Sequence, residues 1–187
     1  MQPMPTAKAV NSAVVRPHGV PAGQAAGANA VFEHTIPSPL GPLRLGATGD
    51  GLCLLDFQDP LRIEAAHRGL NRWLGLPFVP GRNAHIDHAI LELEEYFAGH
   101  RHVFTVPLVA PGTPFEKQVW DALRTIPYGV TWSYADLARA IGNPDAHRAV
   151  GMANGRNRIA LLIPCHRVVN TGGALGGYSG GLGRKRW

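Results

Sequence analysis

The sequence predicts an α+β protein in which a small N-terminal domain with an antiparallel sheet precedes a mainly helical domain with a helix-turn-helix. Short apolar runs separated by turn residues fill positions 31–57, a pattern typical of antiparallel strands. Apolar residues then recur at helical spacing in several segments. The stretch "APGTP" at 110–114 interrupts both patterns, which is typical of a linker. We therefore expect a disordered tail over 1–30, an α+β domain over 31–110 and the helical domain over 111–187.

Composition sets the broad class of the protein. The 187 residues are 45% hydrophobic and 17% charged, and no run approaches the roughly 18 apolar residues of a membrane helix, so we expect no membrane partner. Residues 1–30 have no acidic residue and no continuous apolar core, which favours a disordered tail over a signal peptide, with an organelle transit peptide as the alternative. Cys53 and Cys165 cannot form a disulfide framework, so we expect a cytoplasmic protein, or a nuclear one in a eukaryote.

The N-terminal domain can be read element by element. "VFEHTIPSPLGPLRLGATGDGLCLLDF" predicts two or three antiparallel strands with turns at "SPLGP" and "TGDG", and places Cys53 in the core. "IEAAHRGLNRWLGL" predicts a helix that ends at Gly75, and "HIDHAILELEEYFAGH" predicts a second helix that ends at Gly99. Four histidines near this second helix could be read as metal ligands: His85, His88, His100 and His102. No carboxylate or thiol pattern joins them, so we expect surface histidines and no metal.

The second domain begins with a strong helix start. In "TPFEKQVWDALRTIPYG", Thr113 is an N-cap, Pro114 suits the first helical position and Glu116 completes a capping box. "SYADLARAIGNPDAHRAVGMANGRN" then predicts a Ser-capped helix over 134–141, a turn at "GNPD" and another helix from about Ala146. Helix, short turn and helix is the outline of a helix-turn-helix, although two such helices can also be plain packing.

Charge is unevenly distributed along the chain. Residues 1–114 hold 8 basic and 9 acidic residues, whereas residues 115–187 hold 10 basic and 4 acidic residues. This asymmetry favours a polyanionic partner on one face, with a solvated basic surface as the alternative. Small residues surround Arg148 in the second helix of the pair: Ala146, Ala149, Gly151 and Ala153. They would let the helix backbone approach another surface closely.

The stretch "LLIPCHRVVN" places Cys165 between an apolar run and two potentially cationic residues. "IALLIP" predicts a short buried strand ended by Pro164, so that the cysteine emerges at a turn. A thiol becomes a strong nucleophile as thiolate, which a nearby cation or histidine favours, and His166 and Arg167 follow directly. The alternative is an inert buried cysteine. Seven glycines in "TGGALGGYSGGLG" predict a loop that adopts unusual dihedrals or folds closely around something.

Four motifs in order, "TPFEKQVWDALRTIPYG", "SYADLARAIGNPDAHRAVG", "IPCHRVV" and "GGYSGGL", give the chain a strong resemblance to the O6-alkylguanine-DNA alkyltransferases, or methylated-DNA–protein-cysteine methyltransferases. The resemblance is dense from residue 113 to 182 and weak before it, apart from "LEEYFAGHRHVFTVPL". It implies a ribonuclease H-like N-terminal domain. It also implies repair of O6-alkylguanine, and possible repair of O4-alkylthymine, by irreversible, single-turnover transfer of the alkyl group to the protein's own cysteine.

The resemblance assigns roles residue by residue. It implies that Cys165 is the nucleophile, that His166 is its base through water, that Tyr134 donates to N3 of guanine and that Asn157 holds the active-site turn. It implies that Arg148 enters the base stack while the damaged nucleotide is flipped out. The other implied DNA contacts are Ser133, Ala149, Gly151 and Arg167, and the implied pocket residues are Pro164, Val168, Tyr178 and Ser179. The implied partner is double-stranded DNA containing alkylated guanine, and we expect a monomer without cofactor or metal.

The chain departs from the family pattern at three points. The pattern continues beyond the tryptophan to a glutamate that orients the histidine, and no residue here matches it, which leaves a fragment or an incomplete relay as alternatives. Arg158 stands where a proline commonly follows the asparagine, and the zinc ligands of some members are not matched. Three other functions remain open: a lesion-binding protein of the same fold with weakened catalysis, a cysteine hydrolase, and a helix-turn-helix transcription factor.

Overall fold

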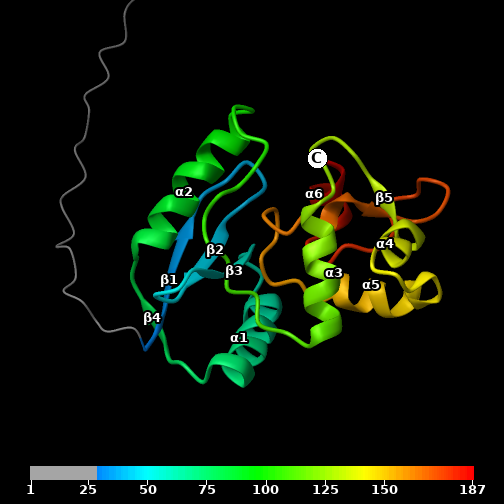
Figure 1. Ribbon diagram of the computed structural model, residues 1–187. Helices are drawn as coiled ribbons and strands as arrows, with labels where there is room; N and C mark the ends of the chain where they lie inside the picture. Colours follow the sequence, from blue (N-terminus) through cyan, green and yellow to red (C-terminus); the bar gives the residue numbers. More distant parts are fainter. Residues whose placement is uncertain (1–28) are drawn as a thin grey trace, which may run out of the picture.

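The computed structural model describes residues 29–187, so all but the last two residues of the tail expected over 1–30 lie outside the described residues. Two parts lie side by side (Figure 1). The N-terminal part, residues 29–110, contains a four-stranded sheet and two helices, and the C-terminal part, residues 111–187, is mainly helical. The predicted α+β fold class is confirmed.

The sheet has the strand order β3-β2-β1-β4. The strands are β1 (Val31–Ile36), β2 (Leu43–Ala47), β3 (Leu52–Phe57) and β4 (Phe78–Pro80). The first three pair antiparallel in sequence order, as predicted, whereas β4 pairs parallel to β1. No local pattern predicts β4, because this strand is only three residues long and ends in a proline.

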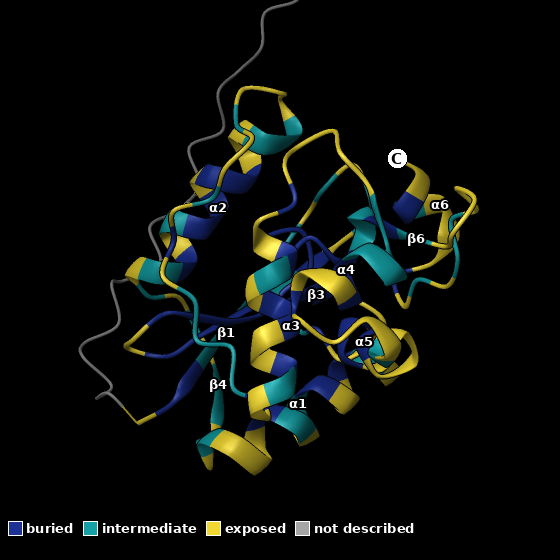
Figure 2. Ribbon diagram, turned by 45° about the vertical axis from the view of Figure 1, so that its right-hand side comes forward, coloured by how far each residue is buried: buried dark blue, intermediate teal, exposed yellow. Residues whose placement is uncertain are grey.

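Two helices cover opposite faces of this sheet. Helix α1 (Pro60–Leu74) packs through Ala66 and Leu70 against one face, and α2 (Ala84–Phe97) packs through its apolar stripe against the other. Both helices alternate between buried and exposed bands in Figure 2. Because both faces are covered, all six residues of β3 are buried, including Cys53. Gly75, at φ 63°, ends α1 as the sequence predicts.

The C-terminal part carries the predicted helix-turn-helix. It contains α3 (Pro114–Arg124), α4 (Tyr134–Ala140), a 3₁₀ turn (Pro144–Ala146), α5 (His147–Gly155) and α6 (Leu182–Arg186). The capping box of Thr113 and Glu116 is present at the start of α3. Helix α3 supports the motif from behind, since the Trp120 indole donates to the carbonyl of Ala153 at 2.9 Å. The predicted helix-turn-helix is confirmed by this arrangement.

The strand predicted for "IALLIP" is wrong. Residues 158–164 form successive turns, with Leu161 at φ 68° and a single bridge between Ile159 and Leu55. The amide of Ile163 donates back to the carbonyl of Ile159 at 3.0 Å, which closes the segment on itself. All of its apolar side chains are buried because the segment lies between the two parts. An apolar run of this length therefore indicates that the segment is buried, but it does not indicate a β-strand.

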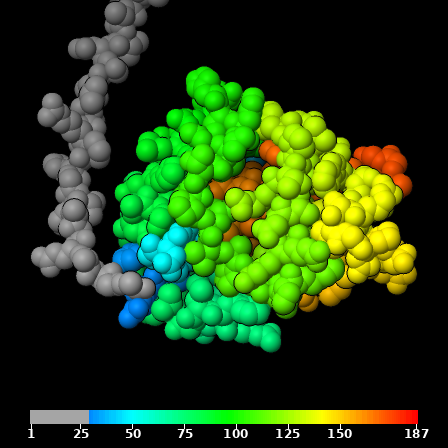
Figure 3. All heavy atoms as spheres, viewed as in Figure 1, coloured from blue at the N-terminus to red at the C-terminus, as the bar shows by residue number. Residues whose placement is uncertain are grey.

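Strand β3 connects the two parts through backbone hydrogen bonds. The Leu55 amide donates to the carbonyl of Arg158 at 2.9 Å, and the Ala160 amide donates to the carbonyl of Leu55 at 2.7 Å. A short parallel pair, β5 (Trp132–Ser133) with β6 (Val168–Val169), joins the start of α4 to the chain just after Cys165. The α4–α5 region, in yellow in Figure 3, forms the side of the molecule farthest from the N-terminal strands.

Candidate active site

Asn157 lies at the centre of the turn that carries the cysteine. Its Nδ2 donates to the carbonyl of Ile163 at 2.8 Å and to Cys165 Sγ at 3.1 Å, and its Oδ1 accepts from the Ile159 amide at 2.9 Å. One buried side chain thus satisfies two backbone groups of the turn and contacts the sulfur. The structure therefore places Asn157 where it can hold both the turn and the thiol.

Cys165 begins a 3₁₀ turn, Cys165–Arg167, and its side chain is nearly enclosed, since the residue is 5% exposed. Burial raises the pKa of the Cys165 thiol, whereas the hydrogen bond from Asn157 lowers it. Two groups of the N-terminal part also act on it, because Asp56 raises this pKa and Arg62 lowers it. The resting thiol is therefore protonated, and it needs a base to become a nucleophile.

His166 is held in its neutral form. Burial, together with the positive charges of Arg167 and Lys185, lowers the pKa of His166 to about 4. Its Nδ1 is buried and has no hydrogen-bond partner among residues 29–187. A neutral imidazole with a free nitrogen can accept a proton, although no direct hydrogen bond between His166 and Cys165 is present in the described part of the chain.

Tyr134 opens α4 beside the thiol. Burial raises its pKa, so the phenol keeps its proton and remains a donor at neutral pH. Asn154 of α5 lies next to it and donates from Nδ2 to the carbonyl of Cys165 at 3.4 Å. The sequence-based reasoning missed Asn154. Asn154 lies four residues after Val150 on the buried side of α5, and that helical spacing was the available signal.

Lys185 is a second residue that the sequence-based reasoning missed. It is only 7% exposed, and its Nζ donates to the carbonyls of Leu175 and Gly177, the latter at 3.1 Å. The ammonium therefore anchors the glycine-rich loop that carries Tyr178. Burial lowers the pKa of Lys185, and the negative charge that Cys165 can carry raises it. A buried lysine among glycines leaves no periodic signal, because its carbonyl partners lie 8 and 10 residues away.

The four expected pocket residues differ in how far they are buried. Pro164 and Val168 are buried, Tyr178 is half-buried, and Ser179 is exposed. Burial and the charge of Cys165 raise the pKa of Tyr178, so its phenol is a neutral wall. Pro164 and Val168 belong to the turn that carries Cys165, whereas Tyr178 and Ser179 belong to the glycine-rich loop.

The residues expected to contact DNA divide into two groups. Arg148 and Ala149 are exposed on α5, Ser133 caps α4, and the ring of Tyr134 packs near Gly151. These residues come from the two helices of the helix-turn-helix.

Arg167, the remaining residue expected to contact DNA, is held by the loop after α3. Its guanidinium donates to the carbonyl of Ile126 at 2.7 Å and lies 5.6 Å from the centre of the Tyr128 ring. Both partners belong to the loop after α3, so the guanidinium is held in the body of the protein. The charge of Arg167 therefore acts on its neighbour His166 and is not presented by α5.

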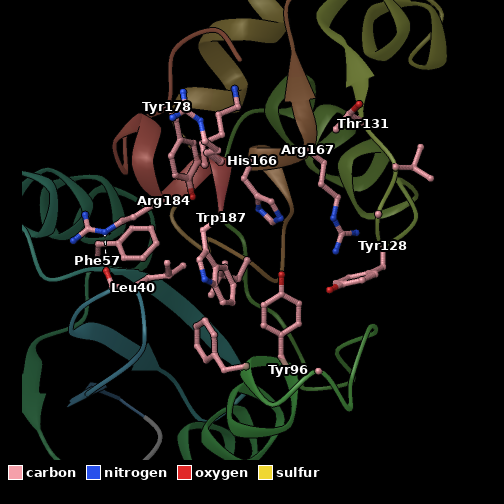
Figure 4. A pocket seen from close by; sticks show the side chains of 17 residues that line it. Leu40, Phe57, Tyr96, Tyr128, Thr131, His166, Arg167, Tyr178, Arg184 and Trp187 are labelled. Carbon is pink, nitrogen blue, oxygen red and sulfur yellow. Dashed lines mark hydrogen bonds between the residues drawn. The ribbon is translucent and has the colours of Figure 1, made fainter. Parts of the chain in front are cut away.

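A cavity of about 540 Å³ lies between the two parts, on the side of His166. Figure 4 shows the His166 ring pointing toward Trp187 and Tyr96 in this cavity. Tyr128 lines it from the loop after α3, whereas Cys165 is not among its lining residues. The cavity thus reaches the expected base and not the sulfur.

The structure also bears on metal and membrane binding. In residues 29–187, no three His, Cys, Asp or Glu side chains gather in a way that could hold a metal ion. Three of the four histidines considered above have other contacts, since His85 lies 3.0 Å from the Gly49 carbonyl, His88 lies 3.3 Å from Glu92 and His102 stacks on Tyr128. Across the same described range, no helix has the length and apolar character needed to traverse a bilayer.

Comparisons with known proteins agree with this geometry. The family model described as 6-O-methylguanine DNA methyltransferase, ribonuclease-like domain, matches residues 31–110, and the model of the DNA binding domain of the same name matches residues 114–187. A protein of Methanosarcina acetivorans named methylated-DNA–protein-cysteine methyltransferase is 42% identical over 159 residues, covering 84% of this chain and 93% of its own. A Mycobacterium bovis protein of the same name is 43% identical, covering 83% and 88%.

Solved structures give the same result. The crystal structure of Mycobacterium tuberculosis OGT in complex with DNA superposes with a TM-score of 0.71 at 43% identity, covering 83% of this chain and 89% of that one. The M. tuberculosis O6-methylguanine methyltransferase, also at 43% identity, superposes with a TM-score of 0.68. The chain belongs to the 6-O-methylguanine DNA methyltransferase family.

Proposed function

We propose that this protein repairs double-stranded DNA by transferring the alkyl group of O6-alkylguanine to Cys165. The observation that carries the proposal is the placement of this one thiol: it lies on a closed turn, 3.1 Å from the amide of Asn157, directly beside the helix-turn-helix. Cys53 offers no alternative nucleophile, because burial within the sheet raises its pKa to about 12.

The transfer forms one bond and breaks one bond. The Cys165 thiol loses its proton to neutral His166, through a water molecule, and the thiolate attacks the alkyl carbon. A carbon–sulfur bond forms while the bond from carbon to O6 breaks, and its electrons remain on guanine. Tyr134, whose phenol keeps its proton, donates to N3 of the departing base and offsets that charge.

The pKa values of Cys165 and His166 favour a thiol that reacts only when the substrate is bound. Burial opposes the charged form of both partners, since it raises the pKa of Cys165 and lowers the pKa of His166 to about 4. A thiolate–imidazolium pair in the empty site is therefore costly. A bound purine that excludes water and accepts a hydrogen bond from Tyr134 would lower the barrier during the transfer itself.

We propose that α5 enters the minor groove of DNA. Arg148 and Ala149 are exposed on this helix, and the basic excess of residues 115–187 would favour the phosphate backbone. Because O6 is inaccessible within a duplex, the damaged nucleotide must flip out, and Arg148 would take its place in the stack. The related M. tuberculosis protein was crystallised in complex with DNA, which supports this partner.

The thioether product is stable, so each molecule acts once. We further propose that the protein acts as a monomer and without a cofactor or metal. We place this activity in the cytoplasm, or in the nucleus if the source is a eukaryote. A lesion-binding protein with little catalysis is the second candidate, because the thiol is only 5% exposed. A cysteine hydrolase would turn over repeatedly, which also separates it from the main proposal.

Intact-protein mass spectrometry tests the proposal directly. After incubation with a duplex containing O6-methylguanine, we expect a methyl group in place of one thiol hydrogen, located on the peptide that contains Cys165. Cys165→Ser should show no gain in mass, whereas Cys53→Ser should behave as the wild type. A folded protein that binds the duplex but gains no mass would support the lesion-binding candidate, and repeated turnover or a methyl group on Cys53 would exclude the mechanism.

A further inference from the structure

The Arg158 side chain occupies the space beside Gly69, where α1 has no side chain. Its guanidinium packs against Gly69 in the middle of α1 so closely that a Cβ on Gly69 would lie 2.6 Å from two of its nitrogens. The same guanidinium donates to the carbonyl of Pro111 at 3.2 Å. A glycine inside a helix costs about 1 kcal/mol relative to alanine, and this close approach is a physical reason for it. Arg158 thus reaches from the active-site turn into the N-terminal part.

The placement of the charged Arg158 side chain lowers the stability of the fold, so a contribution to stability does not explain it. The side chain is half-buried, and burial lowers its pKa. Two other arginines line the same cavity of about 210 Å³, and both have carboxylate partners: Arg62 pairs with Asp56 and Arg156 pairs with Glu116. Among residues 29–187, no carboxylate lies within 4.0 Å of the Arg158 guanidinium.

The backbone of Arg158 connects this contact to the sulfur. Its carbonyl accepts from the Leu55 amide of β3 at 2.9 Å, so residue 158 is attached to the N-terminal part by both backbone and side chain. Asn157 is the preceding residue, and its amide donates to Cys165 Sγ at 3.1 Å. A shift of residue 158 would therefore move the group that contacts the thiol.

We infer that Arg158, seated against Gly69, is a positioning residue for alkyl transfer: it fixes the active-site turn on the N-terminal part so that Asn157 stays in contact with the sulfur. The inference rests on the proposed transfer to Cys165. It also gives the N-terminal part a role in the reaction that does not require contact with DNA.

Two variants break the same contact from opposite sides. Arg158→Ala removes the guanidinium, whereas Gly69→Ala displaces it with a Cβ and leaves Arg158 in the chain. Each should slow single-turnover transfer by roughly three- to tenfold, with duplex and with free O6-benzylguanine alike, as expected for one lost hydrogen-bonded contact. Duplex affinity should not change. Because both variants remove one contact, the double variant should be no slower than the slower single variant.

A pH profile separates positioning from simple destabilisation. The Asn157 bond lowers the thiol pKa, so both variants should shift the pH dependence of Cys165 alkylation by iodoacetamide to higher pH, in a Cys53→Ser background. His166, the neighbour of Cys165 in sequence, remains unchanged, as do the titratable or charged groups that interact with the thiol: Asp56, Arg62, Tyr134, Tyr178 and Lys185. Arg158→Lys, which can still donate to Pro111, should fall between wild type and Arg158→Ala.

Two control variants match these changes. Gly155→Ala places a Cβ in open space, and Arg156→Ala removes a guanidinium that pairs only within the C-terminal part. Neither should shift the pH profile. Additive rate effects in the double variant, or an unshifted profile in Gly69→Ala, would overturn the inference. A wild-type protein that transfers no alkyl group would instead defeat the proposed function, so the two failures are distinguishable.

Discussion

Replacement of Asn157 by alanine should weaken the fold and the thiol together. Asn157 is 6% exposed, and its side chain makes three hydrogen bonds of 3.1 Å or shorter inside the turn: with the Ile159 amide, the Ile163 carbonyl and Cys165 Sγ. Alanine removes all three contacts. It also leaves the buried Ile159 amide without a partner, in a segment too enclosed for easy hydration, whereas the Ile163 carbonyl still accepts from the Cys165 amide.

The size of the effect follows from these contacts. Each intramolecular hydrogen bond contributes about 1 kcal/mol, so Asn157→Ala should lower the free energy of unfolding by about 3 kcal/mol. In a protein of this size, that loss corresponds to a fall in Tm of about 6–12 °C. The pKa of Cys165 should rise as well, because the amide donor that lowers it is gone.

Thermal unfolding and thiol alkylation measure the two effects separately. Calorimetry should show the fall in Tm, while the rate of Cys165 alkylation by iodoacetamide should become half-maximal at a higher pH. Asn71→Ala, an exposed asparagine in α1, is the control and should stay within about 0.5 kcal/mol of wild type. If Asn157→Ala unfolds at the wild-type temperature, or if its alkylation profile is unshifted, the reasoning about this turn is wrong.

Three further predictions concern single side chains. Arg148→Ala should slow repair of duplex DNA far more than reaction with free O6-benzylguanine, and equal slowing in both assays would contradict nucleotide flipping. Tyr134→Phe should slow transfer from O6-benzylguanine by about tenfold or more, but not transfer from its 3-deaza analogue, which lacks the acceptor; equal losses would exclude a proton donor to N3. The pKa of His166 falls from 6.5 to about 4 on folding, so in this window the unfolded chain binds the extra proton and stability falls as pH falls. Urea midpoints at pH 7 and pH 5 should therefore differ less in His166→Gln than in wild type, and an unchanged difference would show that His166 is not buried as a neutral ring.

Most of the fold could be predicted from local sequence patterns. The capping box at Thr113, the glycine end of α1 at Gly75 and the helix-turn-helix each depend on residues within one or two turns of chain, and all were predicted. The turn around Leu161 was not, because burial between two parts looks the same in sequence as burial inside a sheet. Strand β4 pairs with residues more than 40 positions away, which no local pattern records.

The site divides in the same way. The motif residues Cys165, Asn157 and Tyr134 were selected from the sequence, and the structure brings them together around one sulfur. Lys185 was missed, because its role is to donate hydrogen bonds to two loop carbonyls, and only the folded chain brings these carbonyls to its ammonium. Arg167 stands next to the histidine in sequence, but the carbonyl of Ile126 holds it away from α5, and adjacency alone cannot reveal that direction.

The hydrogen bonds between β3 and residues 158–160 also limit how the chain can be divided. A piece ending before residue 111 would expose an edge strand that is apolar at five of its six positions, with the Leu55 amide and carbonyl unpaired. Such an edge is a template for aggregation. We therefore expect the ribonuclease-like segment to be insoluble when produced alone. The two parts should unfold together, as one cooperative unit.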